Sequence, residues 1–278
     1  MQKQPASAFR ELEKSGWESA VADYDDAFTG LTSQSIAPLL DALQVKTDTR
    51  LLDVACGPGQ VAAQAAQRGA QVLGLDFSAA MVALARRRHP QLRFEEGDAE
   101  ALALPDAAFD AVAMNFGLLH LDRPEQALTE AARVLAPGGR CGFTVWAAPP
   151  QTEGFRIVLD AIEQHGRIDV PLPPGPPFFR YSDAVVASEA LLAAGLVEPR
   201  VVIVPQLWRF SRPEELFEAM LHGTVRTAAL LRAQTAPALS RIRAAIGAGA
   251  AAFTGSDGIG IPMPSVLAVA RKPLQRIG

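Results

Sequence analysis

The chain has 278 residues, of which 49% are hydrophobic and 20% charged, and its 26 basic and 30 acidic residues give a formal net charge of −4. A chain of this length can bury roughly 70–75% of the surface that its unfolded form exposes, which excludes disorder as its main state. Because the slight negative charge provides no basic field for gathering phosphates, we expect no nucleic-acid partner.

Cysteine content and hydropathy indicate the compartment. The two cysteines, Cys56 and Cys141, are too few for a disulfide framework. No apolar run reaches the ~20 residues of a membrane span, and the first residues lack the basic and apolar segments of a signal peptide. We therefore expect a cytoplasmic protein without a membrane partner, and a homodimer is left open.

The segment from Ser7 to Leu43 shows helical periodicity. Trp17, Val21, Tyr24 and Phe28 recur at spacings that place them on one helix face. Such a face is typical of packing, and the alternative is a lid over a cofactor.

Short apolar runs then alternate with alanine-rich stretches up to residue 146. Asp122 and Glu125 are spaced as a helix N-cap and N3 pair, and Pro137-Gly138-Gly139 is expected to end the same helix. The regular alternation predicts a parallel sheet with helices on both faces. We expect strands at Arg50–Ala55, Gln71–Asp76, Leu92–Glu96, Phe109–Met114 and Arg140–Trp146, and helices at about Gln60–Arg68, Ala79–Arg88 and Pro124–Leu135.

The pattern loosens after Trp146, where the proline-rich segment 171–177 predicts an extended loop. No linker of low contact density separates this part, so we expect one domain with a helical insertion between its last two strands. The expected elements are a helix at Asp183–Ala194, a strand at Arg200–Val204, a helical stretch from the Ser211–Glu214 capping box to about Ala252 with a weak point at Pro237, and a strand at Val266–Ala270.

The strongest motif is a buried strand from Leu51 that ends in a tight glycine turn. Gly57 and Gly59 lack the Cβ atoms that would block a ligand. Asp76 ends the next strand, at the edge where open α/β sheets bind ligands, and its carboxylate can accept both hydroxyls of a ribose. Asp98 and the Ala99 backbone follow the third strand and can bind an adenine edge. The alternative is that Asp76 and Asp98 only cap helices.

Two cofactor classes fit this turn. Gly57 to Ala62 satisfies the dinucleotide pattern G-x-G-x-x-G/A, so an NAD(P)-dependent oxidoreductase is the rival interpretation. Asp53 argues against it, because two like charges ~5 Å apart repel by ~3 kcal/mol at an effective dielectric constant of 20. A ligand with an amino group and a sulfonium would instead be attracted, which favours S-adenosylmethionine.

Five ordered motifs together resemble the class I S-adenosylmethionine-dependent methyltransferases, and they are similar to the small-molecule branch that contains quinone-biosynthesis enzymes. The resemblance implies an α/β fold with a Rossmann-like, mostly parallel sheet of seven strands and an antiparallel last strand. It also implies methyl transfer to a small, mostly apolar organic molecule. The motifs are Leu51–Gly59, Val72–Ser78, Gly97–Glu100, Phe109–Val112 and Arg133–Gly139.

The resemblance also implies the cofactor site, residue by residue. Ala55 stands where many members have the first glycine of the turn, and Met81 would face the adenine unless it is plain core. No metal site is predicted. The predicted cofactor-binding residues are Tyr24, Asp53, Ala55, Gly57, Gly59, Asp76, Phe77, Met81, Asp98, Ala99 and Asn115.

The resemblance covers about Asp48 to Trp146. Beyond the resemblance, we expect a single domain, 1–278, with N-terminal helices or a lid in 1–47, a cofactor core in 48–146 and an acceptor side in 147–278. The apolar face of the helical insertion, about 211–252, is expected to cover the acceptor and exclude water, and the alternative is that this face only packs on the sheet or on a second subunit. His120 is the best candidate for a general base, and a structural histidine is the alternative. A third interpretation, from another class, is a module that binds S-adenosylmethionine without catalysis.

Overall fold

The computed structural model describes residues 7–274, apart from the side chains of residues 22–26, and the described chain forms two compact units. The larger unit contains Thr32–Trp146, Pro176–Val204 and the chain from Ser265 on. The smaller unit contains the chain up to Leu31 together with Ala147–Gly175 and Pro205–Pro264.

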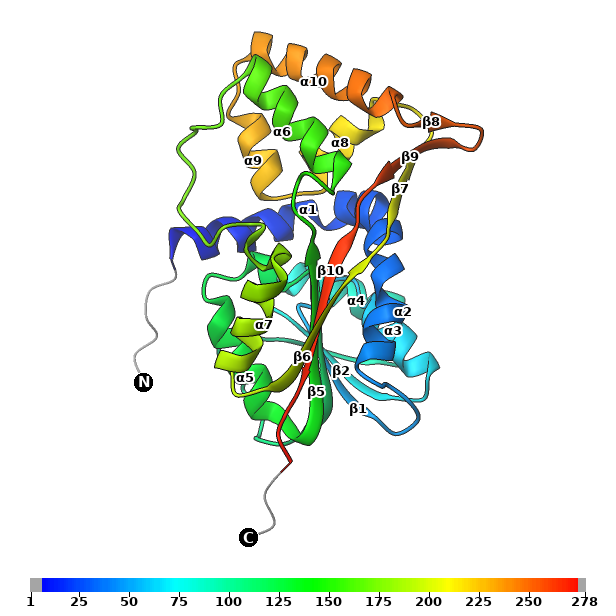
Figure 1. Ribbon diagram of the computed structural model, residues 1–278, viewed down its shortest axis with the longest axis vertical. Helices are drawn as coiled ribbons and strands as arrows, with labels where there is room; N and C mark the ends of the chain where they lie inside the picture. Colours follow the sequence, from blue (N-terminus) through cyan, green and yellow to red (C-terminus); the bar gives the residue numbers. More distant parts are fainter. Residues whose placement is uncertain (1–6, 275–278) are drawn as a thin grey trace. The chain divides into compact units, whose positions relative to one another are not determined.

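A seven-stranded sheet forms the centre of the larger unit (Figure 1). Neighbouring strands are parallel except at β10, which runs antiparallel to both β5 and β6. This arrangement confirms the predicted mostly parallel sheet with an antiparallel last strand. In spatial order the strands are β3 (Arg93–Glu96), β2 (Gln71–Asp76), β1 (Arg50–Val54), β4 (Phe109–Asn115), β5 (Leu135–Trp146), β10 (Ser265–Arg271) and β6 (Val197–Val204).

Helices cover both faces of this sheet, as the β-α-β alternation predicts (Figure 1). One face packs against α2 (Ile36–Ala42), α3 (Gln60–Gln67) and α4 (Ala79–Arg88), and the other against α5 (Pro124–Val134) and α7 (Ala184–Ala193). A buried core joins leucines of α2 to apolar residues of β1, β4 and β10. Three short 3-10 helices complete the unit: η1 (Ser33–Ser35), η2 (Leu118–His120) and η3 (Arg180–Ser182).

The smaller unit combines helices with a short antiparallel sheet. Its α6 packs along α10, where a Cβ on Gly249 would lie 2.7 Å from Ile157, so the close approach of these helices requires glycine. Within residues 7–274, no helix is both long and apolar enough to cross a bilayer. The elements are α1 (Ala8–Thr32), α6 (Glu153–His165), β7 (Leu207–Phe210), α8 (Glu215–His222), α9 (Arg226–Arg232), α10 (Ala236–Ala251), β8 (Thr254–Gly255) and β9 (Gly258–Pro262).

The predicted helical stretch after Ser211 is three helices, and its start was assigned wrongly. Glu214 is not the partner of Ser211, because the backbone N–H of Ser211 donates to the carboxylate of Glu215 at 2.9 Å. Pro237 is no weak point inside a helix, because it lies in the first turn of α10, where a proline costs no backbone hydrogen bond. Helix α6 and the sheet of β7, β8 and β9 were not predicted.

Two expected signals around α5 are also wrong. Arg123, and not Asp122, is the N-cap residue of α5, and no side chain caps this end. Pro137-Gly138-Gly139 does not precede the fifth strand but lies within β5, at an irregularity where Gly138 has φ +82°. A glycine with positive φ bends the strand there without ending it.

Candidate active site

The carboxyl ends of the parallel strands collect most of the predicted site residues along one edge of the sheet. Asp53 lies near the end of β1, Asp76 ends β2 and Asn115 ends β4. Asp98 follows β3 in the loop beyond it. The topology therefore brings together side chains that are up to 62 positions apart in the sequence.

The turn after β1 has an unusual backbone. Ala55, Gly57 and Gly59 all have positive φ, at +54°, +49° and +90°. A Cβ on Gly59 would lie 2.8 Å from the ring of Phe94, whereas a Cβ on Gly57 would meet nothing within 4 Å. Gly59 is thus required by close packing, and Gly57 exposes its backbone to open space, as a ligand cradle needs.

Asp53 is a buried acid with one unsatisfied oxygen. Its Oδ2 accepts a hydrogen bond from the backbone N–H of Ala62 at 3.1 Å, in the first turn of α3. Its Oδ1 is buried and has no hydrogen-bond partner in the described part of the chain. Such an orphan acceptor is costly unless a ligand supplies a donor.

Burial raises the pKa of Asp53 to about 8, against the hydrogen bond from Ala62, and the charge of Asp76 raises it further. At pH 7 the carboxyl group is therefore mostly protonated in the free protein. A protonated Asp53 repels a pyrophosphate less than the ionised group expected from the sequence does. The unsatisfied Oδ1 remains, and a cationic donor would satisfy it and favour ionisation.

Asp76 links two turns. Its Oδ2 accepts from the N–H of Gly57 and its Oδ1 from the N–H of Ser78, both at 2.9 Å. The cap of α4 is Ser78, whose hydroxyl accepts from the N–H of Met81, so Asp76 is not the helix cap. Burial raises the pKa of Asp76, whereas its hydrogen bonds and positive charge on His120 lower it. Since a carboxylate offers about four acceptor sites, Asp76 keeps capacity for ligand hydroxyls.

Four further residues predicted to bind the cofactor follow β2 and β3. Met81 and Ala99 are buried, and Phe77 and Asp98 are half-buried. The Oδ1 of Asp98 accepts from the N–H of Glu100 at 2.9 Å, which fixes the loop after β3. These positions keep their predicted roles as proposals.

Asn115 is occupied by protein partners. Its Oδ1 accepts from the hydroxyls of Ser35 at 2.9 Å and Thr144 at 2.7 Å, and its Nδ2 donates to the carbonyl of Thr32 at 3.1 Å. The side chain therefore ties η1 and the end of α1 to the sheet. Ser35 and Thr144 carried no motif that reveals this link in the sequence, because it depends on the pairing of β4 with β5.

His120 ends η2, directly beyond β4, and its side chain is half-buried. Its ring lies 6.1 Å from the ring of Phe178, and its backbone N–H donates to the carbonyl of Gly117 at 3.0 Å. A positive charge on His120 lowers the pKa of Asp76, so the two groups are within electrostatic range of each other. Tyr24 lies in α1, and its side chain is outside the described part of the structure.

Glu100 is a further buried acid that the motif analysis gave no role. It accepts hydrogen bonds from the backbone N–H of Arg123 at 2.8 Å and from its Nε at 3.0 Å. This pair fastens the loop after β3 to the start of α5. The motif Gly97–Glu100 marked the position, but its partner lies 23 residues away.

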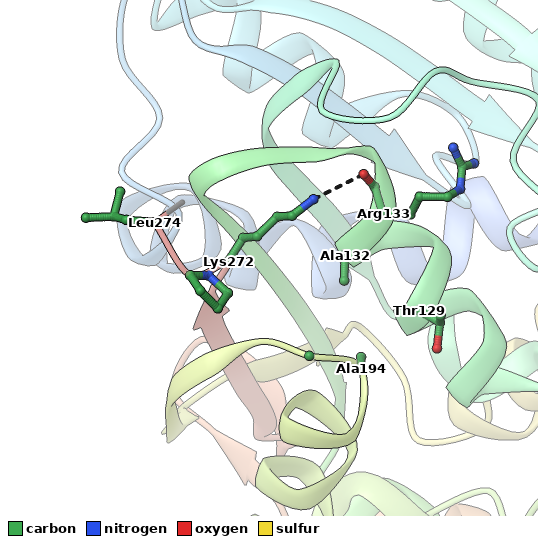
Figure 2. A pocket seen from close by; sticks show the side chains of 8 residues that line it. Thr129, Ala132, Arg133, Ala194, Lys272 and Leu274 are labelled. Carbon is green, nitrogen blue, oxygen red and sulfur yellow. Dashed lines mark hydrogen bonds between the residues drawn. The ribbon is translucent and has the colours of Figure 1, made fainter. Parts of the chain in front are cut away.

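A pocket of about 490 Å³ lies elsewhere in the larger unit (Figure 2). Lys272 reaches from the chain after β10 and donates to the carbonyls of Arg133 and Leu135, which satisfies the end of α5 (Figure 2). Because Lys272 donates to the carbonyl of Leu135, the first residue of β5, this pocket is at the opposite edge of the sheet from Asp53 and Asp76. It is not the candidate active site.

The hydrogen-bond acceptors at the carboxyl edge of the sheet fit the groups of S-adenosylmethionine. An orphan carboxylate oxygen on Asp53 suits an ammonium group, and the open backbone at Gly57 leaves space beside it. The remaining acceptor sites of Asp76 suit the two hydroxyls of a ribose.

Comparison with known proteins finds similarity over the part of the chain that contains these residues. Residues 52–143 match the family model described as a methyltransferase domain. A demethylmenaquinone methyltransferase of Beutenbergia cavernae is 42% identical over 111 residues, which cover 40% of this chain and 46% of that protein. The chain spans about half the length of the curated relatives it matches.

Solved structures share the fold over more of the chain. Phosphoethanolamine N-methyltransferase 2 of Haemonchus contortus, in complex with S-adenosyl-L-methionine, has a TM-score of 0.58 at 18% identity and covers 98% of this chain and 61% of its own. The [4+2]-cyclase SpnF has a TM-score of 0.51 at 25% identity and covers 87% and 81%. The oxidoreductase interpretation receives no support from these relatives. The predicted resemblance to class I S-adenosylmethionine-dependent methyltransferases, similar to the quinone-biosynthesis enzymes, is therefore confirmed.

Proposed function

We propose that the protein transfers a methyl group from S-adenosylmethionine to a small, mostly apolar organic molecule. The observation that carries this proposal is the unsatisfied, buried Oδ1 of Asp53 beside the open glycine turn, within the segment that matches a methyltransferase domain. The proposal includes a cytoplasmic location. Two free, buried cysteines favour a reducing compartment.

The chain's own groups divide the work of holding the donor. Asp53 would bind the ammonium group, Asp76 the ribose hydroxyls, and Asp98 with the Ala99 backbone the adenine edge. When bound, S-adenosylmethionine supplies a methyl group on a sulfonium that is already a good leaving group. The protein's main contribution is then alignment of the acceptor atom with that methyl group, an effect that can provide several kcal/mol.

His120 is the proposed general base for an acceptor that must lose a proton. Its half-buried side chain is in the 3-10 turn that follows β4, at the carboxyl edge of the sheet. A residue in this role contributes ~10²–10⁴ in rate.

The acceptor proposed for a first assay is a demethylmenaquinone-type quinol. The support is the name of the relative from Beutenbergia cavernae. That similarity covers only 40% of this chain, so the segments proposed to surround the acceptor are outside it. The quinol therefore serves as an apolar, aromatic probe for the proposed class of acceptor.

The experiment measures transfer of a radiolabelled methyl group from S-adenosylmethionine to the quinol. We expect transfer by the unmodified protein and a fall of ~10²–10⁴ in kcat for His120→Ala. His165→Ala, at the end of α6, is the matched control and should leave kcat unchanged. A less than threefold fall for His120→Ala with an unchanged pH profile would make His120 structural. Tight donor binding without transfer to any tested acceptor would instead favour a non-catalytic module.

A further inference from the structure

The backbone conformation of Gly117 does not require a glycine. It has φ −83° and ψ −39°, a right-handed conformation that any residue adopts. A Cβ at this position would lie 2.5 Å from the Cβ of Ala55 and 3.5 Å from the carbonyl oxygen of Val54. The missing side chain at Gly117 is thus required by the space that the methyl group of Ala55 occupies.

Ala55 is itself an exception in its turn. It has φ +54°, in the left-handed region that favours glycine, and it lies two residues before Gly57. A non-glycine residue in this conformation is uncommon and persists where its surroundings hold it. The methyl group of Ala55 therefore projects from a constrained turn toward the second turn, which contains Gly117.

The second turn is constrained as well. Phe116 has φ +57°, and its backbone N–H donates to the carbonyl of Thr144 at 3.1 Å and lies 3.0 Å from the hydroxyl of the same residue. The ring of Phe116 also lies 4.1 Å from that of Trp146. Since both contacts fix Phe116 to β5, Gly117 cannot move away from Ala55 without disturbing them.

The position of His120 depends on this second turn. The carbonyl of Gly117 accepts the backbone N–H of His120, and Gly117 is the N-cap residue of η2. A displacement of Gly117 is therefore transmitted to the start of η2. The turn after β1 meanwhile presents Gly57, whose N–H is bound by Asp76.

We propose that Ala55 and Gly117 form a matched pair that sets the spacing between the donor-binding turn and the turn that carries His120. Gly117 is in this sense a positioning residue, which acts through Ala55 on the donor and through η2 on His120. The inference rests on the proposed function for its ligand, S-adenosylhomocysteine. The contact between Ala55 and Gly117 does not depend on which ligand the protein binds.

The test is a cycle of Gly117→Ala, Ala55→Gly and the double variant, with calorimetric affinity for S-adenosylhomocysteine as the readout. Carbon atoms approach favourably to about 3.5–4.0 Å, so a Cβ at position 117 forces the turns apart by roughly 1 Å. We expect at least a tenfold loss of affinity when Gly117→Ala is made in the unmodified protein. In the background of Ala55→Gly, adding Gly117→Ala should change the affinity by less than threefold.

Gly247→Ala is the matched control, because a Cβ there meets nothing within 4 Å and the residue is in α10. It should leave the affinity unchanged. A loss from Gly117→Ala that is as large in the background of Ala55→Gly would overturn the pairing. If Gly117→Ala does not fold, recovery of folding in the double variant supports the pair and its absence contradicts it.

The two failures are distinguishable. If the unmodified protein binds no S-adenosylhomocysteine, the proposed function fails, and the same cycle is then measured by thermal unfolding. A Tm lowered by Gly117→Ala and restored in the double variant would still support the matched pair, whereas additive changes would overturn it.

Discussion

Buried carboxyl groups of Asp53 and Asp76 differ in how far the protein satisfies them. Asp76 accepts two backbone hydrogen bonds, one on each oxygen, whereas Asp53 accepts one and leaves its Oδ1 without a partner. An unsatisfied buried acceptor costs ~1–3 kcal/mol. Asp53 is therefore the group that gains most from a ligand, and its pKa of about 8 makes that gain depend on pH.

We expect Asp53→Asn to remove a pH dependence of donor binding. An ammonium group favours the ionised carboxylate, so the unmodified protein must release a proton on binding at any pH below about 8. Raising the pH lowers this cost, by up to about tenfold in affinity per pH unit, until the free carboxyl group is ionised. The ratio of S-adenosylhomocysteine affinities, unmodified protein over Asp53→Asn, should rise from pH 6 to pH 8 and then level off.

Calorimetry at four pH values measures this ratio. Ionisation of the ligand's own groups affects both affinities alike and therefore cancels in the ratio. A ratio that stays constant from pH 6 to pH 8 would show that the free carboxyl group is already ionised or does not touch the ligand.

The sequence predicts the position of a residue in the sheet where the succession of strands along the chain alone decides it. Asp53 and Asp76 follow from the ends of consecutive parallel strands, and the structure places both at the same edge. The bonds of Asn115 and the match between Ala55 and Gly117 were not predictable, because each joins residues that are 29 to 83 positions apart in the chain.

Helices of the insertion show the limit of periodicity. The apolar spacing from residue 211 to 252 predicted one long helical stretch, but the structure has three helices. Gly223 follows α8, and Thr235 caps α10 through a hydrogen bond from the N–H of Ala238. A glycine or a threonine inside a helical pattern does not by itself end a helix. Packing within the smaller unit therefore decides that the helices end and begin at these residues.

The apolar face of the insertion was expected to cover the acceptor, and that role is still a proposal. Leu216, Phe217 and Met220 are almost fully buried in the structure. The guanidinium of Arg243, from α10, lies 5.3 Å from the ring centre of Phe217. The contact with Arg243 lies within the smaller unit, and their burial places all three side chains among the core residues of the protein.

We therefore expect Phe217→Ala to lower stability. Loss of a buried phenylalanine side chain removes its transfer free energy and leaves a cavity, which costs ~3–5 kcal/mol. Urea unfolding should show this loss, whereas Ile168→Ala, at a side chain that is 52% exposed, should change stability by less than about 0.5 kcal/mol. A change below about 1 kcal/mol for Phe217→Ala would mean that this side chain is free to contact an acceptor.

The two compact units divide what the sequence could and could not establish. The five motifs lie in the larger unit, where the predicted mostly parallel sheet of seven strands with an antiparallel last strand is confirmed. The smaller unit collects segments from three parts of the chain, and its antiparallel sheet joins β7 to β9 across about 50 residues. No local pattern indicates such a pairing, which is why this sheet was missed.

The central claim is that the glycine turn binds S-adenosylmethionine and not a dinucleotide. Calorimetric titration of one sample with S-adenosylhomocysteine and then with NADH tests it directly. An ammonium group would satisfy the orphan Oδ1 of Asp53, whereas a pyrophosphate would leave it without a donor and add negative charge beside it. We expect micromolar binding of S-adenosylhomocysteine and no measurable binding of NADH; tight binding of NADH with none of S-adenosylhomocysteine would contradict the claim.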